Sequence, residues 1–179
     1  MSTLDHLALA GLLKEAMAAG QLPFFEVTSG SMAPLLRVGD EVGVQSVSLN
    51  QLRKGDVVVV CDRDHMWTHR YCGSKQTDEG AFFVTRGDRS LVHDRLWAAD
   101  QLLGRVVVRR RDGQQLWLDY GQGHRLNRSL ARLSHYDEVA LNKLSSLPVS
   151  GTAALFRRLA HRLFRMMAYT LTEAFEHAI

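Results

Sequence analysis

Apolar side chains recur at a helical spacing along the first residues of the chain. This spacing predicts a short amphipathic helix over residues 3–20, which Ser2 or Thr3 can cap and Gly20 can end. The residues that keep the period are Leu4, Leu7, Leu9, Leu12, Leu13 and Met17.

From Pro23 to about Leu118, short apolar runs alternate with turn residues. The four valines of Val57–Val60 indicate a strand that is covered on both faces. Asp112 and Gly113, between two apolar runs, are a two-residue hairpin signal. Turns about every 8–12 residues predict a mainly β, barrel-like domain. The expected strands are 24–28, 41–47, 57–61, 65–73, 81–85, 103–110 and 115–119, with a polar loop at 73–80 and an irregular crossing at 92–100.

Beyond Tyr120 the sequence becomes helical and basic. Residues 145–151 predict a linker, and residues 152–177 predict a helix with one apolar side and one side of arginines and His161. Two interpretations of this last helix stay open. It can contact an anionic membrane surface, or it can pack on its own domain or a partner with the arginines facing water.

These patterns divide the chain into three expected parts. An N-terminal helix occupies residues 1–21, a β domain occupies residues 22–120, and a basic helical extension occupies residues 121–179. The total of 179 residues is enough for one domain with a proper core.

Composition and charge narrow the function classes only slightly. The net charge of +3 and the pI of about 9.1 are too moderate to indicate sequence-specific binding of nucleic acid. No run of about eighteen apolar residues predicts a transmembrane helix, and the N-terminus lacks the pattern of a signal peptide. We therefore expect a cytoplasmic protein, with any membrane contact peripheral through residues 152–177. In that compartment Cys61 and Cys72 are expected to be free thiols.

Candidate chemistry begins at Ser31, inside the stretch Thr28–Pro34. Gly30 allows a sharp turn and a close approach of a ligand, and Pro34 prevents a strand from continuing. The expected result is a serine at the mouth of a tight turn with free backbone N–H groups beside it. A nucleophile with an oxyanion hole needs this geometry, although similar serine-glycine pairs are common in plain loops.

His69 lies on the strand that follows the valines. Strand alternation puts it on the same face as Trp67 and Tyr71. An imidazole there can act as a general base if an aspartate accepts a hydrogen bond from its other ring nitrogen. Asp88 and Asp94 are the candidates, and the Gly-Asp pair at Asp88 is also a common turn former.

A zinc site is an alternative use of the same region. Its ligands would be Cys61, His65, His69 and Cys72. Four residues along one strand span about 13 Å, so these side chains converge only if the turn at 62–64 folds them together. Their spacing also matches no known zinc pattern.

Taken in order, the short motifs resemble those of the signal peptidase I family, which shares its β fold with the LexA-type self-cleaving repressors. The resemblance covers about residues 24–110. The motifs are Ser29–Pro34, Gly39-Asp40, Lys54–Val58, Thr68–Arg70, Thr85–Asp88 with Asp94, and Leu103–Val106.

The resemblance implies a role for each of these residues. Ser31 falls on the family's nucleophile. His69 stands where the eubacterial branch has a lysine base, as in the endoplasmic-reticulum and archaeal branch. Asp94 is the favoured orienting carboxylate, and Asp88 matches a second one. Ser29 is a candidate oxyanion donor. Met32 occupies a position that borders the substrate cleft in the family, although packing is the commoner role of a methionine there. No metal or cofactor is implied.

Three departures from the family pattern limit the expected function. The family's N-terminal membrane anchor is not expected here, Arg89 and Ser90 replace the usual asparagines, and residues 121–179 match no part of the family that we can place. We expect a Ser-His-Asp endopeptidase that cleaves a leader or signal-like peptide. The alternative is a catalytically inactive peptide-binding module of the same fold. A self-cleaving regulator would need a DNA-binding domain, for which residues 1–20 are too few.

Overall fold

A computed structural model describes residues 3–63, 65–145 and 151–176. Single 3₁₀ turns lie at Leu49–Gln51 and Ala99–Gln101. The main elements in these ranges are α1 (Thr3–Ala18), β1 (Phe24–Glu26), β2 (Glu41–Gln45), β3 (Val57–Cys61), β4 (Met66–Thr77), β5 (Gly80–Arg86), β6 (Leu96–Ala98), β7 (Leu102–Arg111), β8 (Gln114–Trp117), α2 (Gly121–Ser145) and α3 (Gly151–Glu176).

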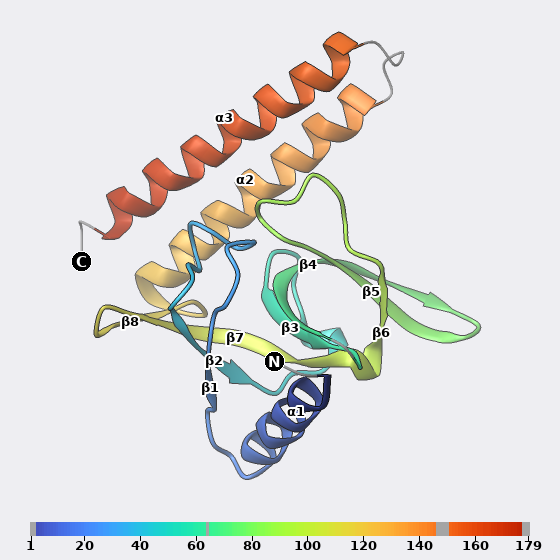
Figure 1. Ribbon diagram of the computed structural model, residues 1–179, viewed down its shortest axis with the longest axis vertical. Coiled ribbons are helices and arrows are strands. Elements are labelled where there is room, and N and C mark those ends of the chain that lie inside the picture. Colours follow the sequence, from blue (N-terminus) through green and yellow to red (C-terminus); the bar gives the residue numbers. More distant parts are fainter. Residues whose placement is uncertain (1–2, 64, 146–150, 177–179) are drawn as a thin grey trace.

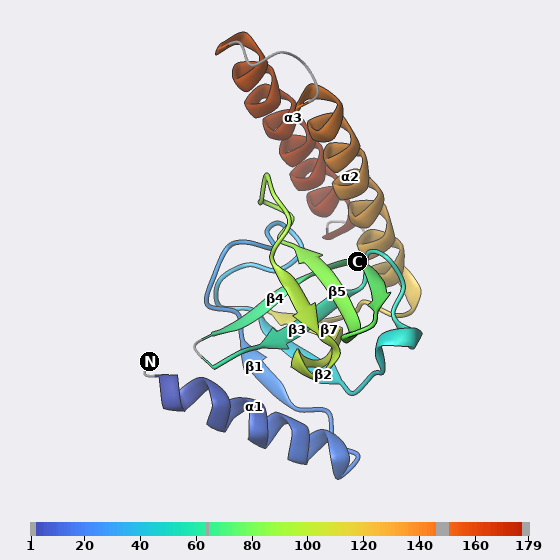
Figure 2. The same cartoon turned by 90° about the vertical axis from the view of Figure 1, so that its right-hand side faces the viewer.

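The strands form one antiparallel sheet that curls into a half-barrel (Figure 1). Its order is β1-β2-β7-β3-β4-β5-β6, and β8 pairs with β7. The helix α1 lies at one end of the sheet, and α2 and α3 run side by side at the other (Figures 1 and 2). The molecule is therefore mixed α/β, which corrects the expectation of a mainly β chain. Among the described residues, no helix is both long and apolar enough to cross a bilayer.

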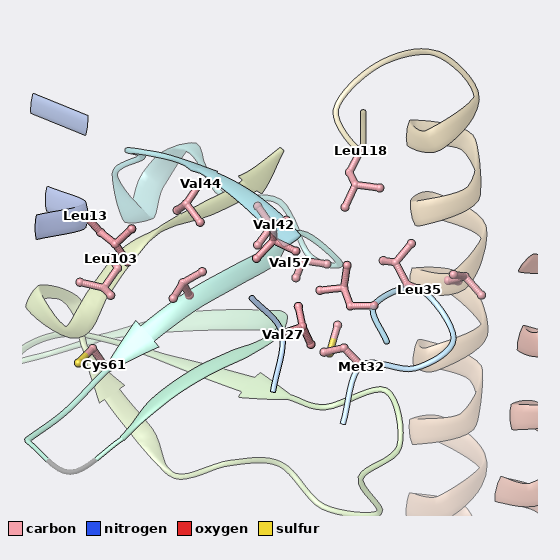
Figure 3. Close-up of a cluster of buried hydrophobic side chains, with 14 of the residues drawn as sticks. Leu13, Val27, Met32, Leu35, Val42, Val44, Val57, Cys61, Leu103 and Leu118 are labelled. Atoms are coloured by element: carbon pink, nitrogen blue, oxygen red, sulfur yellow. The ribbon is translucent and has the colours of Figure 1, made fainter. Parts of the chain in front are cut away.

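The central strand β3 is buried along its whole length, which confirms the prediction that both of its faces are covered. Alternate residues enter two hydrophobic clusters. Val57, Val59 and Cys61 join the larger cluster, which also receives Leu13 from α1 (Figure 3). Val58 and Val60 join the smaller cluster on the other face. The larger cluster also buries Met32 and Leu35, so the loop after β1 is tied to the core.

The hairpin between β7 and β8 confirms the turn expected at Asp112-Gly113. Both residues have positive φ, 50° for Asp112 and 77° for Gly113. A two-residue turn of this kind matches the twist of the two strands, and aspartate and glycine tolerate its backbone.

Two local predictions were wrong. The polar stretch 73–80 is no loop, because β4 continues to Thr77 and pairs with β5 as a projecting hairpin. Much of this hairpin is exposed to solvent. Exposed antiparallel strands can carry polar side chains, so the polar composition does not prevent strand formation. The stretch 92–100 contains β6, which pairs with the outer edge of β5. The expected linker at 145–151 falls mostly on residues 146–150, outside the described part of the chain.

Candidate active site

Ser31 lies in a tight turn directly after the chain leaves β1. The Ala33 N–H donates to the Gly30 carbonyl at 3.2 Å, which closes the turn around Ser31. Asp40 holds the far end of the same loop, because its carboxylate accepts two hydrogen bonds from the Arg111 guanidinium, at 2.8 and 2.7 Å. The loop that carries the serine is thus fixed to the sheet at β7.

The structure brings Ser31, His69 and Asp94 into one hydrogen-bonded line. His69 Nδ1 lies 2.6 Å from Asp94 Oδ2, and His69 Nε2 lies 3.1 Å from Ser31 Oγ. An ionised carboxylate can only accept, so we assign the imidazole proton to Nδ1. Nε2 is then free to accept the hydroxyl proton of Ser31. His69 is 7% exposed, so little water competes for this proton.

The carboxylate of Asp94 has further support behind it. Thr85 Oγ1 donates to Asp94 Oδ2 at 2.6 Å, and the buried indole N–H of Trp97 donates to Thr85 Oγ1 at 2.8 Å. The Asp94 N–H also donates to the Thr85 carbonyl. These contacts fix the position and the rotamer of Asp94. Because Asp94 binds His69 Nδ1, they also orient the imidazole.

Asp88 does not contact His69 through any hydrogen bond found among the described residues. Both of its oxygens accept from the Arg70 guanidinium, at 2.7 and 2.6 Å. Arg70 also donates to the Gly55 carbonyl and to Asn127 of α2. The structure therefore places Asp94, and not Asp88, against the imidazole. Asp88 lies in a buried ion pair that joins the site to α2.

Gly87 allows the serine and the histidine to approach each other. A Cβ at this position would lie 3.1 Å from His69 Nε2 and 3.3 Å from Ser31 Cβ. The next residues hold the turn that carries Ser31, because the Arg89 N–H donates to the Ser31 carbonyl at 3.0 Å.

Replacing Gly87 with alanine is therefore expected to separate Ser31 from His69. The added Cβ requires its neighbours to move by only a few tenths of an ångström. Since a displacement of about 1 Å at a reacting group can lower a rate by about 100-fold, we expect a loss of about 3- to 10-fold in peptide cleavage. Gly11→Ala is the matched control, because a Cβ at Gly11 meets nothing within 4 Å. Equal activity of the two variants would show that the close contact at Gly87 has no role in positioning.

Ser29 and Met32 flank Ser31 in different ways. Ser29 Oγ lies 3.2 Å from Ser31 Oγ, so the two hydroxyls are within hydrogen-bond reach. Within the described chain, the Ser31 N–H donates to no other backbone group. Both groups are therefore candidates to donate to an oxyanion. Met32 is 1% exposed; it packs into the core and also lines the cleft beside the serine.

A cleft of about 720 Å³ opens beside Ser31. One wall is the chain from Phe25 to Ser29, and the other is the chain from His65 to His69. His6 and Leu9 of α1 also line it. The lining combines apolar side chains with a few polar groups near the serine, which is the usual character of a ligand site.

Neither cysteine is a reactive thiol. Burial, followed in size by the charge of Glu138, raises the pKa of the Cys72 thiol to about 12, so it stays protonated at neutral pH. Burial also raises the pKa of Cys61. Across the residues that the structure describes, no group of three or more His, Cys, Asp or Glu side chains is placed to hold a metal ion. This includes the four residues of the alternative zinc site.

Several residues of this site were not assigned by sequence reasoning. Thr85 and Trp97 support Asp94, and Asn127 binds Arg70, only through hydrogen bonds across the fold. His161 of α3 is a further case, because its Nε2 lies 3.3 Å from the Arg89 carbonyl oxygen and its Nδ1 lies 2.9 Å from Asp137 Oδ2. Thr85 and Asn127 are polar residues within otherwise apolar or basic patterns, which is the one signal that could have singled them out.

No protein-family model matches this chain, and no curated protein sequence shows significant similarity to it.

Proposed function

We propose that this chain is a serine endopeptidase that uses Ser31, His69 and Asp94 to cleave a leader or signal-like peptide. The observation that carries the proposal is the line of two hydrogen bonds from Asp94 through His69 to Ser31. A nucleophile, a base within hydrogen-bond reach and a group that orients the base are the parts that acyl transfer requires.

In the first half of the reaction, Ser31 Oγ attacks the carbonyl carbon of the scissile peptide bond. His69 Nε2 accepts the serine proton, and the nearby charge of Asp94 stabilises the imidazolium that forms. The carbonyl oxygen becomes an oxyanion, which the Ser31 N–H and the Ser29 hydroxyl can bind. His69 then gives its proton to the leaving amine as the C–N bond breaks.

In the second half, water enters the site vacated by the amine. His69 removes a proton from this water, which attacks the acyl ester on Ser31. Collapse of the second tetrahedral intermediate breaks the bond to Ser31 Oγ, and His69 returns the proton to the serine. The carboxyl product leaves and the enzyme is restored.

The two walls of the cleft favour an extended peptide as the substrate. Within the described sheet, β1 pairs only with β2, and the part of β4 from Met66 to His69 pairs only with β3. Each wall therefore presents a strand edge with unpaired backbone groups. A peptide in extended form can add to such edges through main-chain hydrogen bonds, which would bring its carbonyl carbon to Ser31.

The same edges could hold a peptide without cleaving it, which is the rival function as a binding module. The geometry favours the enzyme over the module. A groove that only binds a peptide does not require a serine hydroxyl 3.1 Å from an imidazole. It also does not require a hydrogen-bonded chain from Trp97 through Thr85 to Asp94. Polar chains of this kind are found where a reacting group must be held in one orientation.

A mixed library of unstructured peptides tests the proposal. The protein is incubated with the library, and mass spectrometry identifies new termini. We expect cleavage by the wild-type protein at a defined sequence pattern and none above the background by Ser31→Ala. The Ser74→Ala variant, which changes an exposed serine of the β4–β5 hairpin, is the matched control. Cleavage that persists in Ser31→Ala would exclude Ser31 as the nucleophile.

A further inference from the structure

One face of α3 is apolar and points away from the rest of the molecule. Exposed fractions on this face run from 47% for Met167 to 67% for Met166. The spacing of these residues places them along one side of a helix. The apolar stripe, as we call this set, consists of Leu155, Phe156, Leu159, Leu163, Met166 and Met167.

The opposite face of α3 is the one that folding buries. His161 and Thr172 are buried there, and Leu171 and Phe175 pack against the core cluster. Glu176 fixes the end of the helix, with an oxygen 2.9 Å from the Arg109 guanidinium. Because these contacts hold α3 in one rotation, the apolar stripe faces solvent.

Arginines form a ridge beside the apolar stripe. Arg158 and Arg162 are exposed, and Arg165 is half-buried. The sequence from residue 155 to residue 167 contains four arginines and no acidic residue. A cationic ridge along an apolar stripe is the pattern of helices that lie in the interface of an anionic membrane.

A notch of about 460 Å³ lies where the ridge meets the stripe. Arg162 and Arg165 can donate hydrogen bonds to a phosphate, and Met166 adds an apolar wall. Glu173 is the one carboxylate in its lining. The notch therefore joins donors for an anionic headgroup to a surface for acyl chains. Its full lining is Arg162, Arg165, Met166, Tyr169, Thr170 and Glu173.

We propose that α3 docks on the surface of an anionic phospholipid bilayer. The apolar stripe enters the boundary between headgroups and acyl chains, and Arg158 and Arg162 contact the phosphates. A second copy of this chain fits the surface less well, because an antiparallel two-fold contact along the stripe would place the two cationic ridges side by side.

Docking of α3 would also bring the candidate active site near the membrane. His161 on the buried side of α3 contacts the Arg89 carbonyl, and the Arg89 N–H binds the Ser31 carbonyl. The helix and the turn that carries Ser31 are thus joined through one residue, Arg89. A surface that holds α3 would hold the cleft at a fixed distance from the lipid.

Vesicle flotation tests the proposal with the full chain. The probes are vesicles of phosphatidylcholine alone and of phosphatidylcholine with phosphatidylglycerol. We expect the protein to float with the mixed vesicles and to be released by high salt. Arg158→Gln with Arg162→Gln should weaken partition by about 30-fold, taking about fivefold for each arginine at an anionic surface. Leu159→Gln, Leu163→Gln and Met166→Gln together should abolish flotation.

Matched variants keep the test independent of folding and of catalysis. Arg53→Gln with Lys75→Gln removes two exposed positive charges elsewhere and should float as the wild type does. Ser31→Ala should also float normally, whatever its activity. The proposal fails if the wild type does not float with anionic vesicles, or if it floats equally with neutral ones. It also fails if the triple variant still floats, or if sedimentation shows a dimer that only the triple variant loses.

Discussion

Replacing His69 with alanine is expected to lower the rate of peptide cleavage by about 10⁴- to 10⁶-fold. Without the imidazole, no other base lies against Ser31 Oγ among the hydrogen bonds of the described chain. The measurement is single-turnover cleavage of a peptide chosen from the library, followed by mass spectrometry. His135→Ala is the matched control, because His135 on α2 has a side chain that is 65% exposed. A His69→Ala variant that retains full activity would end the proposal of a Ser-His mechanism.

The Asp94→Asn variant should lose about 10⁴-fold in the same measurement. An amide can donate a hydrogen bond to Nδ1, which favours the tautomer with its proton on Nε2. That nitrogen then faces Ser31 Oγ and cannot accept its proton. Because an amide has nearly the shape of a carboxylate, we expect the melting temperature to change little. Loss of folding in place of activity would assign Asp94 a structural role.

Replacing Asp88 with alanine is expected to lower the free energy of unfolding by about 3–5 kcal/mol. The pair that it breaks is buried, since the Arg70 and Asp88 side chains are 4% and 9% exposed. The guanidinium would be left inside the protein without its carboxylate. For a chain of this size the melting temperature should fall by roughly 10 °C, which calorimetry or circular dichroism can measure.

Asp78→Ala is the control for this prediction. Asp78 is exposed in the turn between β4 and β5, so its loss should leave the melting temperature within about 1 °C of the wild type. The two aspartates near the site thus have opposite expected signatures. Asp94→Asn should lose activity and keep its stability, while Asp88→Ala should lose stability first. Equal melting temperatures for Asp88→Ala and Asp78→Ala would contradict the structural role of the Asp88–Arg70 pair.

Much of the fold could be predicted from short-range patterns. The valine run of β3 and the Asp112-Gly113 turn follow from propensity and periodicity over a few residues. The first helix forms as predicted, but its expected apolar face is only partly right, because Leu12 is exposed while Leu13 is buried. The hairpin at 73–80 could not, because polar residues in a projecting hairpin give no hydrophobic alternation. The edge strand β6 has only three residues, which are too few to show a periodic pattern of apolar side chains.

The candidate site, too, could be predicted only in part from the sequence. The order of the motifs along the chain led to the hypothesis that Ser31, His69 and one of two aspartates form a catalytic triad. It could not assign one aspartate to His69, because His69 and Arg70 are neighbours that face opposite sides of β4. Asp94 meets His69 on one side, and Asp88 meets Arg70 on the other. Which carboxylate reaches which side depends on the path of the loop after β5.

For the last helix, the sequence determined that it forms and that it has an apolar side and a basic side. It did not determine which side is buried. Burial is decided by partners far along the chain, among them Asp137 for His161 and Arg109 for Glu176. Local periodicity follows from backbone geometry within a few residues, whereas these contacts depend on how separate elements pack. The sequence by itself therefore determined the elements and the candidate chemical groups. Only the tertiary structure decided which groups meet and which apolar face remains open to solvent.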